Sequence, residues 1–179
     1  EAADLIFYNG IGLEHGPSLR KSLEYNQKSV SLGDTLKKRS PHLFLTFGGK
    51  IDPHIWMDVG LWRRMVPIIV KELSELDLKH AEIFAKNGQL LMEEMLEVHE
   101  SIKKKLLGIP EKKRFLVTSH DAFNYFSKAY MAAPYEKEID SWAKRCVSPE
   151  GLAPDSQIST SDIQRMLDHM LEYDVRVLF

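Results

Sequence analysis

A long helical pattern in the middle of the chain limits how the rest can fold. Residues 78–107 place apolar side chains at helical spacing on one face, while glutamate and lysine fill the other. Roughly 28 helical residues span about 42 Å, longer than most globular helices. Gly108 and Pro110 end the pattern. We therefore expect one rigid helix that joins two separate lobes. Its apolar positions are Phe84, Leu91, Met95, Val98, Ile102 and Leu106.

Short strand and helix patterns alternate on both sides of this helix. Apolar runs at 4–8, 29–32, 115–118 and 176–179 predict buried strands. Helices are predicted between them, and residues 33–51 and 132–158 are predicted to be irregular. The pattern favours the α/β class, with two (β/α) lobes that contain parallel sheets. The predicted domains are the first lobe at 1–77, the linking helix at 78–107 and the second lobe at 108–179.

Several residues indicate where helices begin. Pro17 suits the first turn of a helix at 17–25. Asp58 is expected to cap a helix that runs to Leu76, in which Pro67 should cause a kink. Asp121 is expected to cap a helix at 121–131. Ser159 or Thr160 should cap the last helix.

Composition excludes several classes of protein. Hydrophobic residues make up 44% of the 179, enough for a real core, and the net charge of −2 gives no electrostatic reason to expect nucleic acid. No apolar run reaches the length of a membrane span, so an integral membrane protein is not expected. The single Cys146 excludes an intrachain disulfide and a cysteine-based zinc site. We interpret it as an inert thiol, the alternative being an odd cysteine whose partner lies in missing sequence.

Both ends of the chain have the pattern of buried strands. Residues 4–8 follow the start almost directly, and Arg176–Phe179 has nothing after it. We therefore expect a fragment cut at both ends. Missing strands would leave sheet edges unpaired, which would favour non-native association.

Two histidines stand at breaks between predicted elements. His54 lies in an Asp52-Pro53-His54 turn ahead of a helix, and His120 directly follows the strand at 115–118. In open α/β sheets ligands bind at the carboxyl ends of strands, and histidine is the commonest metal ligand. Each residue alone is more often structural. Together, from separate lobes, they predict a metal held in a cleft. The sequence has no His-Glu-x-x-His motif, no Gly-rich phosphate loop and no Gly-x-Ser-x-Gly elbow.

Four segments resemble one family, the metal-binding solute-binding proteins (cluster A-I) of bacterial ABC importers for zinc, manganese and iron. Within that family the sequence resembles the chlamydial iron- and manganese-binding members. The resemblance runs in order along nearly the whole chain. Its segments are Ala-Asp-Leu-Ile-Phe-Tyr-Asn-Gly at 3–10 with Leu13-Glu14, Asp-Pro-His-Ile-Trp-Met-Asp at 52–58, Thr-Ser-His-Asp-Ala-Phe-Asn-Tyr-Phe at 118–126 and Gly-Leu-Ala-Pro-Asp at 151–155.

The resemblance implies a non-enzymatic transport component. Its members hold one metal ion between two lobes, in the periplasm or on the outer side of the membrane, and deliver it to a permease. His54 matches a first-lobe ligand and His120 a second-lobe ligand. Manganese-selective relatives often have glutamate where this chain has His120. Imidazole also suits zinc, copper, iron and nickel, so His120 argues against a strictly manganese-selective site.

The same resemblance implies a limit. The family usually has another histidine upstream of Ala3 and an acidic ligand well beyond Phe179. Two imidazoles do not fill a closed four-coordinate site, so this chain is expected to bind metal weakly or not at all. Two other functions are alternatives to this one. One is a metal-dependent hydrolase with Asp121 or Asp52 as general base. The other is a surface adhesin or antigen.

Overall fold

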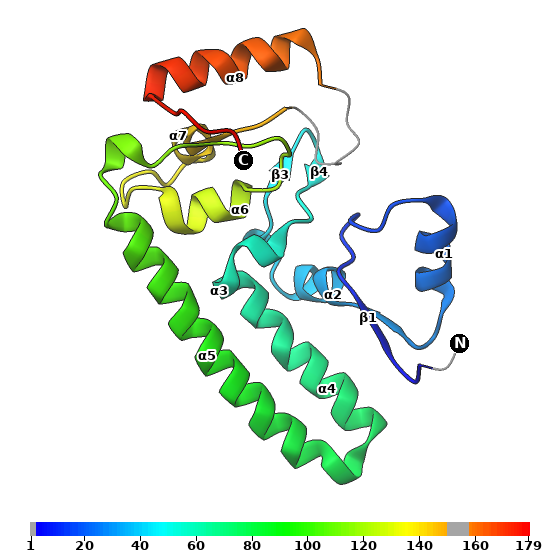
Figure 1. Cartoon of the computed structure of the whole chain (residues 1–179). Coiled ribbons are helices and arrows are strands. Elements are labelled where there is room, and N and C mark those ends of the chain that lie inside the picture. Colours follow the sequence, from blue (N-terminus) through cyan, green and yellow to red (C-terminus); the bar gives the residue numbers. More distant parts are fainter. Residues whose placement is uncertain (1–2, 150–157) are drawn as a thin grey trace. The chain divides into compact units, whose positions relative to one another are not determined.

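The computed structural model describes residues 3–149 and 158–179, which form two compact units (Figure 1). The first unit is Glu1–Glu97 and the second is Val98–Phe179. The Gly-Leu-Ala-Pro-Asp segment at 151–155 lies outside the described residues.

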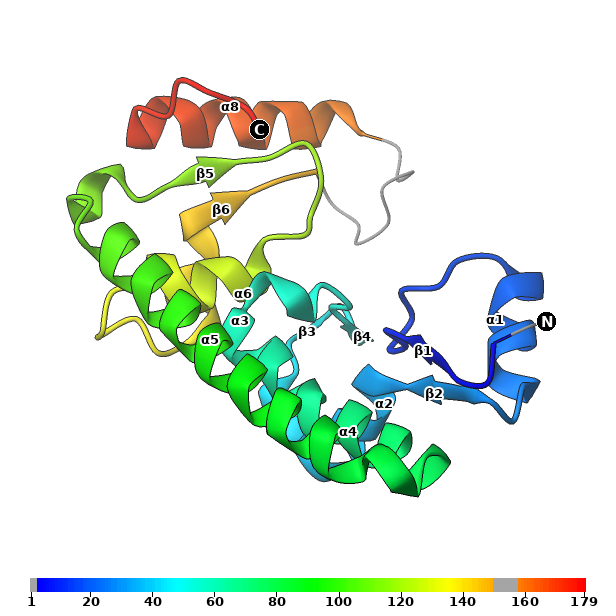
Figure 2. The same ribbon diagram turned by 60° about the horizontal axis from the view of Figure 1, so that its bottom comes forward.

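The first unit opens with a β-α-β arrangement. Strand β1 (Ile6–Tyr8) pairs in parallel with β2 (Ser29–Ser31), with Phe7 opposite Val30, and α1 (Pro17–Tyr25) connects them. Figure 2 shows the two strands side by side. Pro17 occupies the first turn of α1 as predicted. A second, antiparallel pair is the hairpin of β3 (Thr46–Phe47) and β4 (Lys50–Ile51).

A helix follows β2 where an irregular segment was predicted. Helix α2 (Leu32–Arg39) begins at once after β2, and Ser31 caps it by accepting a hydrogen bond from the Asp34 amide at 3.3 Å. Its last turn carries Lys37, Lys38 and Arg39, whose charges complement the helix dipole. The prediction that residues 33–51 are irregular was wrong for this helix. A run of basic residues is typical of a surface loop, but it also stabilises the C-terminal end of a helix.

The predicted helix at 58–76 forms in three pieces. Asp58 is confirmed as its N-cap, since its carboxylate accepts from the amides of Gly60 and Leu61 at 2.8 and 3.2 Å. Helix α3 (Val59–Trp62) passes through a 3₁₀ turn at Arg63–Met65 into α4 (Val66–Leu76). Pro67 lies in the first turn of α4. Proline donates no backbone hydrogen bond, so the α-helix is interrupted just before it.

The long helix is α5 (Ala81–Leu107), with 27 residues and a length of about 40 Å. It begins three residues later than predicted, after a 3₁₀ turn at Leu78–His80. In the first unit it packs closely on α4 (Figure 1). A Cβ atom on Gly88 would lie only 2.4 Å from Cγ2 of Val70. Glycine therefore permits this close approach of the two helices.

The second unit contains the other parallel pair. Strand β5 (Leu116–Val117) pairs with β6 (Cys146–Val147), as Figure 2 shows, and Val117 also forms a parallel bridge with Leu178. The predicted strand at 176–179 is reduced to that bridge. β6 lies within a segment predicted to be irregular, because two residues are too few to show a strand pattern. Helix α8 (Thr160–Tyr173) begins at Ser159, whose capping box with Asp162 confirms the predicted cap.

The helix after β5 begins later than predicted. Helix α6 (Asn124–Phe126) continues as a π-helical turn at Ser127–Met131. Asp121 does not cap it; its Oδ1 instead accepts a hydrogen bond from the Asn124 side chain at 2.8 Å. Asp121 and the two residues between it and the helix, Ala122 and Phe123, thus belong to the loop.

A buried ion pair holds the segment that follows, which includes α7 (Ile139–Trp142). Arg145 donates to both carboxylate oxygens of Glu136 at 2.9 and 3.0 Å. Its guanidinium also lies 4.8 Å from the centre of the Phe115 ring. These contacts fasten the chain before β6 to the residue that precedes β5.

The α/β class, with short parallel sheets and one long helix, is confirmed. Among residues 3–149 and 158–179, no helix is both long and apolar enough to cross a bilayer.

Gly10 and Gly12 provide a matched test of the junction between β1 and α2. Both have positive φ, +72° and +89°, but a Cβ on Gly10 would lie 1.8 Å from Ser31 Oγ, while one on Gly12 meets nothing within 4 Å. Both alanine variants incur backbone strain. We expect Gly10→Ala to lower the free energy of unfolding by about 1–3 kcal/mol more than Gly12→Ala, as overpacking does. Urea denaturation measures the difference, and equal losses would contradict the packing described.

Candidate metal centre

His54 lies in a buried turn of the first unit, directly after the β3–β4 hairpin. The turn begins at Asp52, whose amide donates to the Leu45 carbonyl at 3.0 Å. It ends at a 3₁₀ turn, Ile55–Met57, which leads to the cap of α3 at Asp58. Asp52 and Ile55 are fully buried, and His54 is 3% exposed. The turn is thus held by the hairpin on one side and by α3 on the other.

The Asp52 carboxylate fixes the His54 ring. Its Oδ1 lies 2.7 Å from Nδ1 of His54 and also accepts from the His54 backbone amide at 2.9 Å. An ionised carboxylate can only accept, so Nδ1 carries the hydrogen and the ring lone pair lies on Nε2. A carboxylate behind one ring nitrogen is the usual support of a metal-binding histidine. Trp56 packs edge-on against the ring, with the ring centres 5.3 Å apart.

His120 lies in the second unit at the carboxyl end of β5. Its carbonyl accepts from Thr118 Oγ1 at 3.0 Å and from the Ala122 amide at 2.9 Å. One residue earlier, the Ser119 amide donates to the Phe179 carbonyl at 2.7 Å. These bonds hold the backbone of His120 close to the strand end, and the residue is half-buried. This is the edge of a parallel sheet at which ligands bind.

The two histidines belong to different units. Across residues 3–149 and 158–179, no group of three or more His, Cys, Asp or Glu side chains is arranged to hold a metal ion. The chain thus presents single imidazoles rather than a complete ligand cluster within the described residues.

Three other histidines have different surroundings. His80 Nδ1 lies 2.6 Å from the Asp77 carboxylate on an exposed turn. His99 Nδ1 lies 2.9 Å from the hydroxyl of Tyr130. His169 packs against aromatic rings, and burial lowers its pKa. His54 differs from these three because its ring is buried together with a buried carboxylate.

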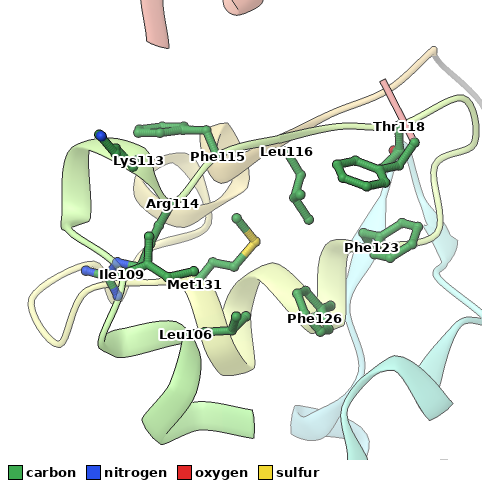
Figure 3. Close-up of a pocket in the computed structure, with 11 residues that line it drawn as sticks. Leu106, Ile109, Lys113, Arg114, Phe115, Leu116, Thr118, Phe123, Phe126 and Met131 are labelled. Atoms are coloured by element: carbon green, nitrogen blue, oxygen red, sulfur yellow. The ribbon is translucent and has the colours of Figure 1, made fainter. Parts of the chain in front are cut away.

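The second unit also contains an apolar cavity of about 260 Å³. Figure 3 shows Leu116 of β5 pointing toward the helix that carries Phe126 and Met131. None of the lining residues is His, Cys, Asp or Glu, so the cavity offers no usual metal ligand. The lining is Leu106, Ile109, Lys113, Arg114, Phe115, Leu116, Thr118, Phe123, Phe126, Met131 and Phe179.

Comparison with known proteins identifies the family. Residues 1–179 match the family model of ZnuA, the periplasmic component A of a zinc-uptake complex. The chain belongs to the ZnuA family. The resemblance to metal-binding solute-binding proteins is therefore confirmed.

This ZnuA-family chain is similar to chlamydial proteins named YtgA over nearly its whole length. The metal-binding protein YtgA of Chlamydia pneumoniae is 44% identical over 175 residues, which cover 98% of the chain and 54% of that protein. The structure of Fe(III)-bound YtgA from Chlamydia trachomatis superimposes with a TM-score of 0.93 at 42% identity, over 99% of this chain and 62% of that one. The zinc-binding protein TroA from Treponema pallidum gives a TM-score of 0.82 at 26% identity, over 99% and 59%. The chain thus spans about half the length of its curated relatives.

Sequence reasoning singled out His54 but missed the role of Asp52. The sequence predicts a role for Asp52 only as the general base of a hydrolase, whereas one of its oxygens is hydrogen-bonded to the His54 ring. The available signal was the Asp-Pro-His spacing. Proline keeps Asp52 extended, so that its carboxylate can reach forward to the residue two positions later.

Cys146 lies on β6 opposite Leu116 of β5, and its thiol contacts Thr118, the residue that follows β5. Burial raises the pKa of the Cys146 thiol to about 11, although its contact with Thr118 Oγ1 at 3.8 Å acts in the opposite direction. A thiol with this pKa is protonated at neutral pH and is a poor metal ligand.

The raised pKa predicts slow alkylation of Cys146. At pH 8 the thiolate fraction should be roughly one in a thousand, about 100-fold below that of a cysteine with a pKa of 9.0. Iodoacetamide should therefore react about 100-fold more slowly with the folded chain than with the same chain in denaturant, as mass spectrometry can follow. Equal rates in the two conditions would show that the thiol is neither buried nor shifted.

Proposed function

We propose that the whole protein captures a transition-metal ion, iron, manganese or zinc, outside the inner membrane and passes it to an ABC permease. It acts in the periplasm or attached to the outer side of the membrane and catalyses no reaction. Membership of the ZnuA family supports this proposal. Relatives described as zinc-, manganese- and Fe(III)-binding support the range of metals. The metal is cargo to be bound and released.

The observation that carries the proposal is the Asp52–His54 pair. A carboxylate 2.7 Å from Nδ1 directs the imidazole lone pair to Nε2 and makes that nitrogen a better metal donor. The pair is buried, so its geometry is set before a metal arrives. A histidine prepared in this way is suited to binding a cation, whereas a hydrolase would need a carboxylate poised to activate water.

His120 is proposed as the ligand from the second unit. Its place at the carboxyl end of β5 supports this role. Two imidazoles favour zinc or iron over a strictly manganese-selective site, because manganese prefers oxygen ligands.

Replacing either histidine in the whole protein tests the ligand assignment. We expect His54→Ala and His120→Ala each to weaken metal binding by more than ~100-fold, since each removes a direct ligand. His42→Ala is the matched control, because His42 is exposed on a 3₁₀ turn of the first unit. Titration calorimetry with zinc, manganese and iron(II) gives the affinities. Wild-type affinity in either ligand variant would refute that residue's assignment.

The 179-residue chain itself is predicted to bind metal weakly or not at all. Its proposed ligands are two imidazoles, which cannot complete a closed four-coordinate shell. Calorimetry with zinc should give no tight one-to-one isotherm. A tight stoichiometric isotherm would defeat this prediction without bearing on the family.

A further inference from the structure

The loop that follows β1 lies against the turn that carries His54. The side-chain amide of Asn9, the first residue after β1, donates to the Pro53 carbonyl at 3.1 Å. The same carbonyl accepts from the Ile55 amide at 2.9 Å. Asn9 therefore holds, across 44 positions of sequence, the peptide group that immediately precedes His54.

The backbone of Asn9 is itself fixed on both sides. Its amide donates to the Glu14 carboxylate at 2.9 Å, and that carboxylate also accepts from the Gly10 amide at 3.1 Å. Its carbonyl accepts from the Gly33 amide in the first turn of α2 at 2.8 Å. A Cβ on Gly33 would lie 2.5 Å from that carbonyl oxygen, so only glycine permits this approach. Asn9 thus connects the β1–α2 junction to the His54 turn through hydrogen bonds of its backbone and its side chain.

We propose that Asn9 is a positioning residue for His54, with Glu14 holding Asn9 in place. This inference rests on the proposed metal-binding role of His54. Asp52 fixes the rotation and tautomer of the ring, while Asn9 fixes the backbone from which the ring projects. The ligand nitrogen is then placed by two independent hydrogen bonds. Partners that orient a metal ligand commonly change metal affinity by about 10–100-fold when removed.

Hydrogen exchange in the metal-free 179-residue chain tests the positioning directly. We expect Asn9→Ala to raise the exchange rate of the Ile55 amide by about 10-fold or more, because its acceptor carbonyl loses a second anchor. Asn9→Asp is the near-isosteric variant: it places an acceptor against the Pro53 carbonyl and should have at least the same effect. Asn26→Ala is the matched control, since Asn26 accepts from the Lys28 amide at 2.9 Å in an exposed turn of the same unit.

Metal affinity of the whole protein gives the second measurement. Asn9→Ala and Asn9→Asp should weaken zinc binding by about 10-fold, Glu14→Gln should weaken it less, and Asn26→Ala should leave it unchanged. Circular dichroism establishes that each variant is folded; if Asn9→Ala fails to fold, Asn9→Asp decides. Wild-type exchange at Ile55 in a folded variant would overturn the proposal. So would weaker metal binding without faster exchange, since Asn9 would then act on the metal itself.

The two measurements separate this inference from the proposed function. If His54→Ala leaves the affinity of the whole protein unchanged, the ligand assignment fails. The exchange rate of Ile55 in the metal-free chain still decides whether Asn9 holds the turn.

Discussion

The first unit depends on how a buried carboxylate is accommodated beside His54. Asp52 is fully buried, and a charge in such surroundings is costly unless it is hydrogen-bonded. Its bonds to the His54 ring and amide, at 2.7 and 2.9 Å, help to offset that cost. The same bonds set the ring orientation. The stability of the turn and the orientation of the proposed metal ligand therefore rely on one contact.

The surrounding elements converge on this turn. The β3–β4 hairpin ends directly before Asp52, and α3 begins after the turn with Asp58 as its N-cap. Asn9, directly after β1, donates a hydrogen bond to the Pro53 carbonyl within the turn. None of these elements is long, and none could place a side chain accurately alone. Pro53 restricts the backbone between them. Several short elements therefore fix the turn together, as a site made of loop residues requires.

Long periodic elements and explicit caps could be predicted from the sequence. Helix α5 followed from its apolar spacing, and the start of the last helix followed from a cap at Ser159 or Thr160, of which the structure uses Ser159. Short elements could not be predicted in the same way. β6 has two residues, and α2 carries a basic run that resembles a loop. The contacts at Asn9 were also beyond reach, because they join residues far apart in sequence.

Charge explains why Asp52 matters beyond geometry. The two proposed ligands are imidazoles, which bring no negative charge to balance a bound cation. The Asp52 carboxylate brings one, because it lies one hydrogen bond behind the ring of the proposed donor nitrogen. Negative charge passed through an imidazole strengthens the nitrogen donor without adding an oxygen ligand. A site built in this way balances a cation's charge while keeping the nitrogen ligands that suit zinc and iron.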